Sequence, residues 1–443
     1  MGRVLIRQAE IVTMNGDNEV LTGDVLIEGD RITQIGQGLD AEADKIVEAR
    51  GQVLLPGFVQ THVHLCQTLF RGRADDMELM DWLRKRIWPL EAAHDEESVY
   101  YSAMLGIGEL IQSGTTTLLD METVNHTDSA FRAMAESGIR AVSGKVMMDK
   151  KGGDVPAVLQ ENTEQSLAES VRLLDKWDGY DGGRLKYAFC PRFVVSCTEE
   201  LLRQVAELSR QYGVLVHTHA AENQEEIAIV QRETGMRNIE YLEHIGLASP
   251  RLVLAHCIWL NDMEREIIKR TGTKVTHCPA SNLKLASGIA GVPGLMEQGI
   301  PVGIGTDGAP CSNTLDMFQE MRLTALIHKV SHGPTAMNAR KVLRMATMGG
   351  AEVLGMEREI GSLEVGKKAD MILLNLDQFH TFPSYDADLF SRVVYAAGRG
   401  DVDSVWIDGR EVMERKRLRT VDKQLILPEA DRAIARLLRA IPS

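Results

Sequence analysis

Short, continuously apolar runs alternate with longer amphipathic segments along most of this chain. The runs occupy residues 57–64, 115–120, 140–148, 184–190, 213–219, 251–256, 273–278 and 300–307. Runs without polar alternation are typical of parallel strands that helices cover on both faces. The eight strand–helix units therefore predict an α/β fold with a closed (β/α)8 TIM-like barrel.

The segments between the runs carry helical patterns. Residues 199–212 place apolar side chains three and four positions apart, which is the spacing of one helix face. Thr198 stands where a helix N-cap is expected, and Gly213 stands where the helix is expected to stop. We therefore predict a helix bounded by these two residues.

Both ends of the chain have a different pattern, with short strands and tight turns. Val25 and Ile27 are separated from Ile32 and Ile35 by a turn at 28–30, which is typical of a hairpin. Residues 369–376 and 403–413 show the same pattern of short strands and tight turns. We predict a small β-sandwich domain built from residues 1–56 and 366–430, a barrel at 57–365 and a C-terminal helical tail at 431–443.

Composition narrows the class of protein. The 443 residues are 44% hydrophobic and 25% charged, as in soluble globular proteins. The net charge of −14 argues against nucleic acid and against an anionic membrane surface as partners. Without a long apolar span or a secretory signal, we expect a cytoplasmic protein with buried, unpaired cysteines. We also expect a homo-oligomer, either a dimer or a tetramer.

Polar side chains collect where the predicted strands end. They are His62, His64, Asp120, His217, His219, His256, His277 and Asp307. In a barrel all strands end at one rim, which is where barrel enzymes carry their chemistry. His62 and His64 are two positions apart on a strand and so share a face. Imidazoles with one carboxylate suit a divalent metal such as Zn2+, and Fe2+ remains an alternative.

Five motifs resemble the amidohydrolase superfamily, and within it the metal-dependent deaminases and chlorohydrolases. They are GFVQTHVHLCQTLFRG, HTHAAEN, AHCIWL, CPASNLKLASG and GTDGAPCSN. The resemblance implies one divalent metal ion with the ligands His62, His64, His219 and Asp307. Of the two histidines on the fifth run, His219 has a glutamate three positions later and matches the ligand. His217 is then expected in the barrel core or in support of the ligands.

The same resemblance implies a hydrolytic mechanism with three catalytic residues. The metal makes a water molecule available as hydroxide near neutral pH. Asp307 takes the proton of this water, and His256 helps to hold it. Glu222 protonates a ring nitrogen beside the carbon under attack, so it contacts the substrate as well, and ammonia then leaves.

Two segments, 69–91 and 281–293, indicate the class of substrate. They resemble methylthioadenosine/S-adenosylhomocysteine deaminases and 5′-deoxyadenosine deaminases, and in the former the glutamate matching Glu91 contacts the ribose. This implies deamination of the adenine ring of 5′-deoxyadenosine, methylthioadenosine, S-adenosylhomocysteine or adenosine. Trp88 offers a flat apolar surface for the ring, whereas we expect Trp82 in helix packing.

One departure leaves the substrate open. Arg192 follows Pro191 where methylthioadenosine deaminases carry a histidine, and a Pro-Arg-Phe sequence here is similar to guanine deaminases. Arg192 is therefore expected to bind the substrate by reading the base or to hold a carboxylate. Guanine deaminases and s-triazine hydrolases remain alternative classes, and residues 149–163 are a candidate lid.

Overall fold

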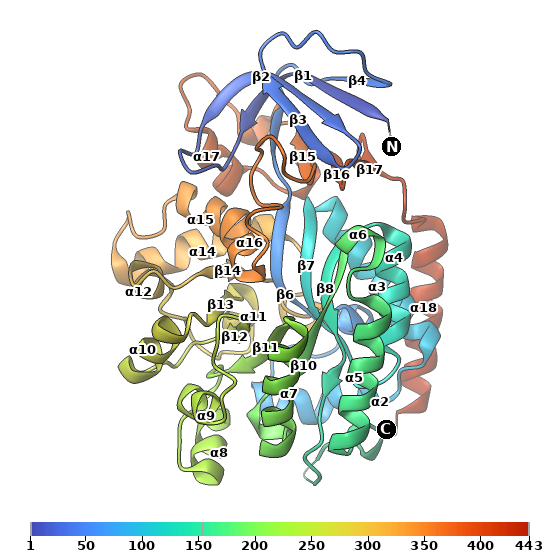
Figure 1. Ribbon diagram of the computed structural model, residues 1–443, viewed down its shortest axis with the longest axis vertical. Coiled ribbons are helices and arrows are strands. Elements are labelled where there is room, and N and C mark those ends of the chain that lie inside the picture. The colour runs from blue at the N-terminus through green and yellow to red at the C-terminus, as the bar shows by residue number, and fades with distance from the viewer. Residues whose placement is uncertain (1, 153, 442–443) are drawn as a thin grey trace.

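The computed structural model describes residues 2–152 and 154–441, which form two sheets (Figure 1). One sheet is a parallel barrel in which every predicted apolar run supplies a strand. Its strands are β6 (Phe58–Val63), β7 (Thr115–Met121), β8 (Arg140–Gly144), β10 (Leu185–Pro191), β11 (Leu215–Ala220), β12 (Leu252–His256), β13 (Lys274–His277) and β14 (Val302–Ile304). The ring closes because β14 pairs with β6 and β10 pairs with β11. The predicted barrel is therefore confirmed.

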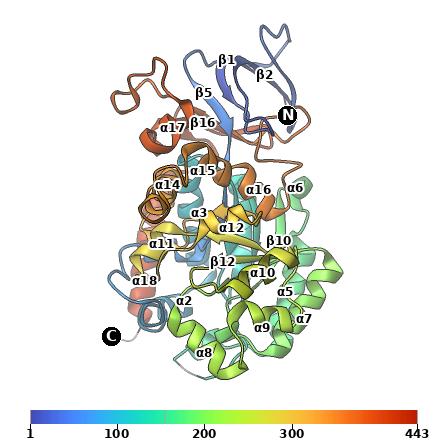
Figure 2. The same ribbon diagram turned by 90° about the vertical axis from the view of Figure 1, so that its left-hand side faces the viewer.

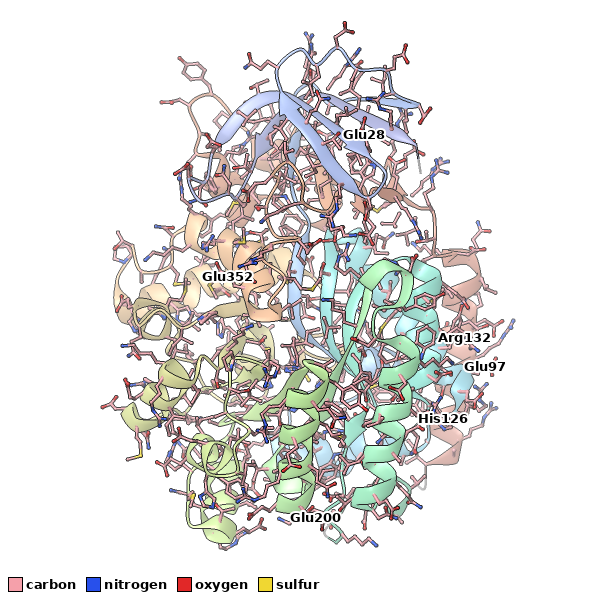
Figure 3. The ribbon with its side chains drawn as sticks, viewed as in Figure 1. Glu28, Glu97, His126, Arg132, Glu200 and Glu352 are labelled. Carbon is pink, nitrogen blue, oxygen red and sulfur yellow. The ribbon has the colours of Figure 1, made fainter. Side chains whose placement is uncertain are left out.

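Helices surround this barrel (Figure 2). The longer ones are α3 (Glu96–Gln112), α4 (Thr127–Ser137), α5 (Thr163–Trp177), α7 (Glu199–Tyr212), α8 (Gln224–Thr234), α9 (Asn238–His244), α10 (Asp262–Thr271), α14 (Met317–His332), α15 (Ala339–Ala346) and α16 (Met348–Leu354). The predicted ends of α7 are confirmed: Thr198 Oγ1 accepts the N–H of Leu201 at 3.2 Å, and Gly213 has a φ of 72°. Charged side chains such as Glu97, Arg132 and Glu200 lie exposed on the outer helix surfaces (Figure 3).

Shorter elements lie in the loops between the barrel strands and helices. They are β9 (Val146–Met147), η1 (Leu65–Phe70), α1 (Leu79–Trp82), η2 (Leu83–Ile87), α2 (Trp88–Ala92), η3 (Ala157–Leu159), α6 (Tyr180–Gly183), η4 (Val194–Ser196), α11 (Pro279–Lys284), α12 (Val292–Glu297) and α13 (Ala309–Ser312). The element η2 is a π-helical turn, a form that is rare and frequent at functional sites. Several of these segments form the wall of the site described below.

Strands from both chain ends form the second sheet, as predicted. They are β1 (Arg3–Val12), β2 (Val20–Glu28), β3 (Arg31–Gly36), β4 (Lys45–Glu48), β5 (Val53–Pro56), β15 (Met371–Leu374), β16 (Val402–Ile407), β17 (Arg410–Glu414) and β18 (Arg417–Leu418). Antiparallel pairing of β15 with β5 joins the two ends into a single nine-stranded sheet. Because β5 leads directly into β6, this sheet lies at the end of the barrel where the strands begin (Figure 1).

The segment between β15 and β16 carries the short elements η5 (Phe379–Thr381), α17 (Leu389–Ser391), η6 (Arg392–Ala396) and η7 (Arg399–Asp401). The chain then ends in α18 (Lys423–Ala440), which packs along α3. This helix begins at Lys423 rather than at residue 431, because the Asp422 carboxylate accepts the N–H of Gln424 at 2.9 Å. Residues 442–443 of the predicted tail and residue 153 of the predicted lid lie outside the described residues.

Across the part of the chain that the structure describes, none of the helices is both long and apolar enough to span a membrane.

A buried ion cluster joins the barrel to the second sheet. Arg140, at the start of β8, donates to Asp370 through Nε at 2.6 Å and through Nη2 at 3.0 Å. Its Nη2 also donates to Asp408 Oδ1 at 2.5 Å, and all three side chains are buried. A buried carboxylate that loses its partner is strongly unfavourable, so this cluster fixes the junction between the two sheets.

We predict that Arg140→Ala lowers the free energy of unfolding by about 3–5 kcal/mol, because the buried Asp370 carboxylate loses its ion-pair partner and Asp408 keeps only Lys368 Nζ, at 3.2 Å. The matched control is Arg172→Ala, which removes an exposed two-bond pair with Glu169 and should cost about 0–1 kcal/mol. Urea unfolding followed by circular dichroism measures both. Equal losses in the two variants would contradict the structural role of Arg140.

Candidate metal centre and active site

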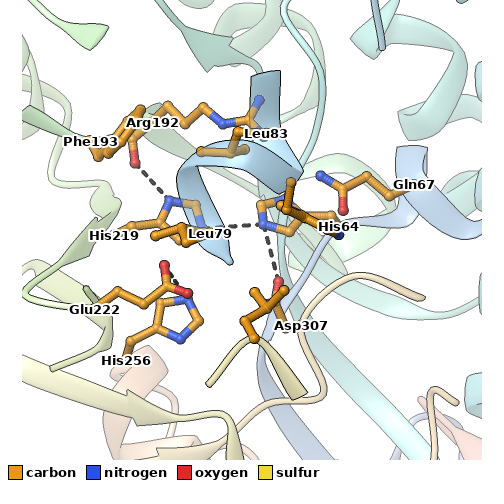
Figure 4. Close-up of a pocket in the computed structure, with 12 residues that line it drawn as sticks. His64, Gln67, Leu79, Leu83, Arg192, Phe193, His219, Glu222, His256 and Asp307 are labelled. Atoms are coloured by element: carbon orange, nitrogen blue, oxygen red, sulfur yellow. Dashed lines mark hydrogen bonds and ion pairs between the residues drawn. The ribbon is translucent and has the colours of Figure 1, made fainter. Parts of the chain in front are cut away.

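A pocket opens at the rim where the barrel strands end (Figure 4). Its polar lining consists of His64, Gln67, Arg192, His219, Glu222, His256 and Asp307. Its apolar lining consists of Leu79, Trp82, Leu83, Phe193 and Leu285. The strand ends of the barrel thus bring together histidines and carboxylates that lie far apart in the sequence, as predicted from the rim of the barrel.

Backbone carbonyls fix which nitrogen of His64 and of His219 faces the pocket. His64 Nδ1 lies 2.7 Å from the carbonyl oxygen of Met121, and His219 Nδ1 lies 2.7 Å from that of Arg192. A carbonyl oxygen can only accept, so each Nδ1 carries the proton and each Nε2 carries a lone pair. The two Nε2 atoms are 3.2 Å apart, so both lone pairs face the same place.

His62 is oriented by another histidine. The Val253 carbonyl oxygen lies 3.1 Å from His217 Nδ1, which leaves His217 Nε2 as an acceptor. His62 Nδ1 donates to this atom at 2.7 Å, and His62 Nε2 is left buried and without a hydrogen-bond partner among the described residues. His217 therefore supports His62 from the barrel interior and does not itself line the pocket.

Asp307 completes this group of donors. Its Oδ1 lies 3.3 Å from Nε2 of His62 and 3.3 Å from Nε2 of His64. Its Oδ2 accepts the hydroxyl proton of Ser281 at 2.6 Å, which holds the carboxylate in place. Burial alone would raise the pKa of Asp307, but the neighbouring histidines hold it well below its usual range. The carboxylate is therefore charged at neutral pH.

The histidines are held in the neutral form that binds metals. Burial lowers the pKa of His62 and His219, and it lowers the pKa of His64 to about 3. Ligand atoms of His62, His64 and Asp307 all lie within 4.8 Å of one another, and the same holds for a second group, His62, His219 and His256. Three neutral imidazole nitrogens with one carboxylate oxygen fit a divalent metal ion, and the unpartnered Nε2 of His62 fits this assignment.

Glu222 and His256 stand beside these donors. Glu222 Oε2 lies 3.5 Å from His256 Nε2, while His256 Nδ1 donates to Asn282 Oδ1 at 2.8 Å. Glu222 Oε1 is buried and unpartnered among the described residues. Burial raises the pKa of Glu222 to about 7, so this carboxyl group is able to carry a proton at neutral pH. A buried acid in a pocket with a raised pKa is a candidate general acid.

Glu91 and Arg192 pair with each other. Arg192 donates to Glu91 Oε2 at 2.6 Å and to Oε1 at 3.2 Å, and Gln67 Nε2 donates to Oε1 at 2.8 Å. Arg192 and Gln67 line the pocket, and Glu91 contacts both of them without being part of the lining itself. The sequence offered both readings of Arg192, and the structure shows it holding a carboxylate.

The two tryptophans are placed differently from the prediction. Both side chains pack in one apolar cluster, but Trp82 lines the pocket whereas Trp88 lies with Arg84 at a neighbouring hollow. The structure therefore corrects the expected placement of both rings: Trp88 is not part of the pocket lining, and Trp82, which was expected in helix packing, is.

Two further polar strand ends do not reach the pocket. Asp120 accepts the N–H of Leu65 at 2.9 Å and the hydroxyl of Ser143 at 2.6 Å. His277 is fully buried and packs against His328, with ring centroids 5.3 Å apart. Sequence reasoning also missed Gln67, which lies one turn beyond His64 in η1, because nothing in its residue type or spacing marks it.

The family model described as "Amidohydrolase family" matches residues 53–412. The chain belongs to the amidohydrolase family. This amidohydrolase is 42% identical to a 5′-deoxyadenosine deaminase of Methanobrevibacter smithii, over 99% of this chain and 98% of the relative. It is 41% identical to a 5-methylthioadenosine/S-adenosylhomocysteine deaminase of Syntrophomonas wolfei, over 98% and 99% of the two chains.

Among solved structures, the amidohydrolase is similar to an adenosine deaminase of Xanthomonas campestris with bound zinc. The TM-score is 0.92 at 32% identity, and 98% of each chain is covered. The likeness therefore extends over the barrel and the second sheet together.

We predict that His217→Phe weakens zinc binding by about 10- to 100-fold, because His62 Nδ1–H loses the acceptor that orients its ring. Competition with a chromogenic chelator measures the zinc dissociation constant. His277→Phe is the matched control, since His277 is an equally buried barrel histidine outside the pocket. Unchanged zinc affinity in His217→Phe, or an equal loss in both variants, would count against the orienting role.

Proposed function

We propose that this amidohydrolase deaminates the adenine ring of a nucleoside that lacks or replaces the 5′-hydroxyl group, with release of ammonia. The observation that carries this proposal is the buried Glu222 carboxyl group beside a convergent set of histidine and carboxylate donors. Hydrolytic deamination of a ring needs both a nucleophilic water and an acid close by. The names of the relatives identical at 42% and 41% support the same substrate class.

We propose that His62, His64, His219 and Asp307 hold one divalent ion and that this ion is zinc. The zinc in the structural relative supports this choice over iron. When bound, such an ion supplies Lewis acidity that lowers the pKa of a water molecule to about 7. The neutral imidazoles and the charged carboxylate are already in the protonation states that binding requires.

Two side chains move protons in the proposed reaction, and a third orients the water. The Asp307 carboxylate accepts a proton from the attacking water, and His256 Nε2 helps to orient that water. Glu222 donates its proton to the ring nitrogen beside the reacting carbon, which makes the carbon electrophilic. The leaving amino group then departs as ammonia after it receives a proton from a carboxylic acid in the pocket.

The remaining pocket wall suits an uncharged nucleoside. Arg192 and Glu91 neutralise each other, and Trp82, Leu79 and Phe193 present apolar surface. Glu91 Oε1 already accepts two hydrogen bonds, but Oε2 accepts only one and keeps a lone pair for a ribose hydroxyl. We propose that Glu91 contacts the ribose through this one oxygen atom.

The pairing of Arg192 also bears on the alternatives. Both terminal nitrogens of its guanidinium each donate one N–H to Glu91, which favours the carboxylate-holding role over the reading of a purine oxygen that the resemblance to guanine deaminases implies. The same histidine and carboxylate groups would also support hydrolytic attack on a triazine ring. Both alternatives are therefore included in the test.

We predict that 5′-deoxyadenosine and methylthioadenosine have kcat/KM values at least about tenfold above that of guanine, because only the nucleosides engage Glu91. The panel also contains adenosine, S-adenosylhomocysteine and a chlorotriazine, with ammonia or chloride release as the measurement. Chelator-treated protein is the control for metal-dependent turnover. Fastest turnover of guanine, or chloride release without nucleoside deamination, would overturn the proposed substrate.

A further inference from the structure

The turn between β11 and α8 carries Glu222 in a strained backbone. Ala221, just before it, is fully buried and has a φ of 53°, a region that residues with a side chain rarely adopt. Such a conformation costs about 1–3 kcal/mol and persists only where surrounding contacts hold it. The position of the Glu222 carboxyl group therefore depends on what fixes this turn.

One side of the turn is fixed by the segment after β12. The carbonyl oxygen of Ala221 accepts the N–H of Ile258 at 2.9 Å and the N–H of Trp259 at 3.0 Å. These two bonds anchor the residue before Glu222. They do not involve the backbone N–H of Glu222, which donates to a different acceptor.

The Glu226 carboxylate is this acceptor. Its Oε2 accepts the backbone N–H of Glu222 at 2.9 Å and that of Asn223 at 3.5 Å. Its Oε1 accepts Asn238 Nδ2 at 2.5 Å, which ties the carboxylate to α9. Glu226 is only 1% exposed, so these hydrogen bonds are shielded from water.

The hydrogen bonds that Glu226 accepts differ from those of an ordinary capping box. In a capping box the third helical residue accepts the N–H of the N-cap residue, which for α8 is Asn223. Here the shorter bond goes to Glu222, one residue before the N-cap. The next two helices, α9 and α10, show the ordinary form: Glu240 Oε2 accepts the N–H of the N-cap Arg237 at 3.3 Å, and Glu264 Oε2 accepts that of the N-cap Asn261 at 3.0 Å.

We propose that Glu226 is a positioning residue that fixes the backbone of Glu222 and thereby aims its carboxyl group at the substrate. The inference rests on the proposed function, in which Glu222 is the proton donor. Glu226 does not line the pocket among the described residues, so it acts through Glu222. Misplacing a catalytic group by about 1 Å lowers turnover by about a hundredfold.

Glu226→Met tests the proposal, because methionine fills a similar volume and accepts no such hydrogen bond. With 5′-deoxyadenosine as substrate, we expect kcat to fall about 10- to 100-fold. We expect KM to change less than about threefold and bound zinc to be retained, since metal and ribose contacts are untouched. Glu226→Gln should recover most of kcat, because its amide oxygen can accept the Glu222 N–H while the Asn238 amide turns to accept from Gln.

Glu264→Met is the matched control for loss of a buried capping glutamate. It should keep kcat within about threefold, because Glu264 accepts hydrogen bonds from Asn261, Arg237 and Ile239 but none from residues 221–223. The decisive measurement is the double variant Glu222→Gln/Glu226→Met. If Glu226 acts only through Glu222, the double variant turns over as slowly as Glu222→Gln alone and no slower.

The results that overturn the proposal are distinct from those that overturn the function. Equal kcat losses in Glu226→Met and Glu264→Met, or losses that multiply in the double variant, contradict the positioning role alone. Wild-type protein that deaminates none of the nucleosides contradicts the proposed function and this inference with it. If Glu226→Met does not fold, Asn238→Leu removes only the tether on Oε1, and an unchanged kcat in that variant contradicts the proposal.

Discussion

The site depends on the hydrogen bonds that direct three imidazole lone pairs toward one carboxylate. His64 and His219 each donate Nδ1–H to a backbone carbonyl, and His62 donates to His217, so that every Nε2 is left for coordination. Buried polar atoms without partners are unfavourable, and a cation among them supplies what they lack. The hydrogen bonds that fix the local fold are therefore the same ones that orient the histidines for metal binding.

The barrel provides this arrangement because all of its strands end at one rim, and the loops that follow the strands form the wall of the pocket. His256 and Asp307 both adopt a positive φ at the ends of their strands, with values of 74° and 61°. Residues in that region are strained and need support from their surroundings, which is common at functional sites. The small sheet and the Arg140 cluster stabilise the opposite end of the barrel, away from the chemistry.

Sequence reasoning was most successful where a single periodic rule applies. Period two placed His62 and His64 on one face, and the common rim of a barrel brought His219 and Asp307 to them. It failed where tertiary contacts decide, as for Trp82 and Trp88, and it left open which role Arg192 takes. Gln67 carries no residue-type signal, because its partner Glu91 is distant in sequence. Glu226 has the spacing of an ordinary capping residue after Asn223, so the sequence does not mark its hydrogen bond to the Glu222 N–H. The expected homo-oligomer and cytoplasmic location stay predictions.

The most direct test of this account is anomalous diffraction from zinc-loaded crystals, recorded on both sides of the zinc absorption edge. The account predicts one peak at about 2.0–2.2 Å from Nε2 of His62, His64 and His219 and from an oxygen of Asp307. If these side chains diverge and no peak lies among them at saturating zinc, the central claim is contradicted.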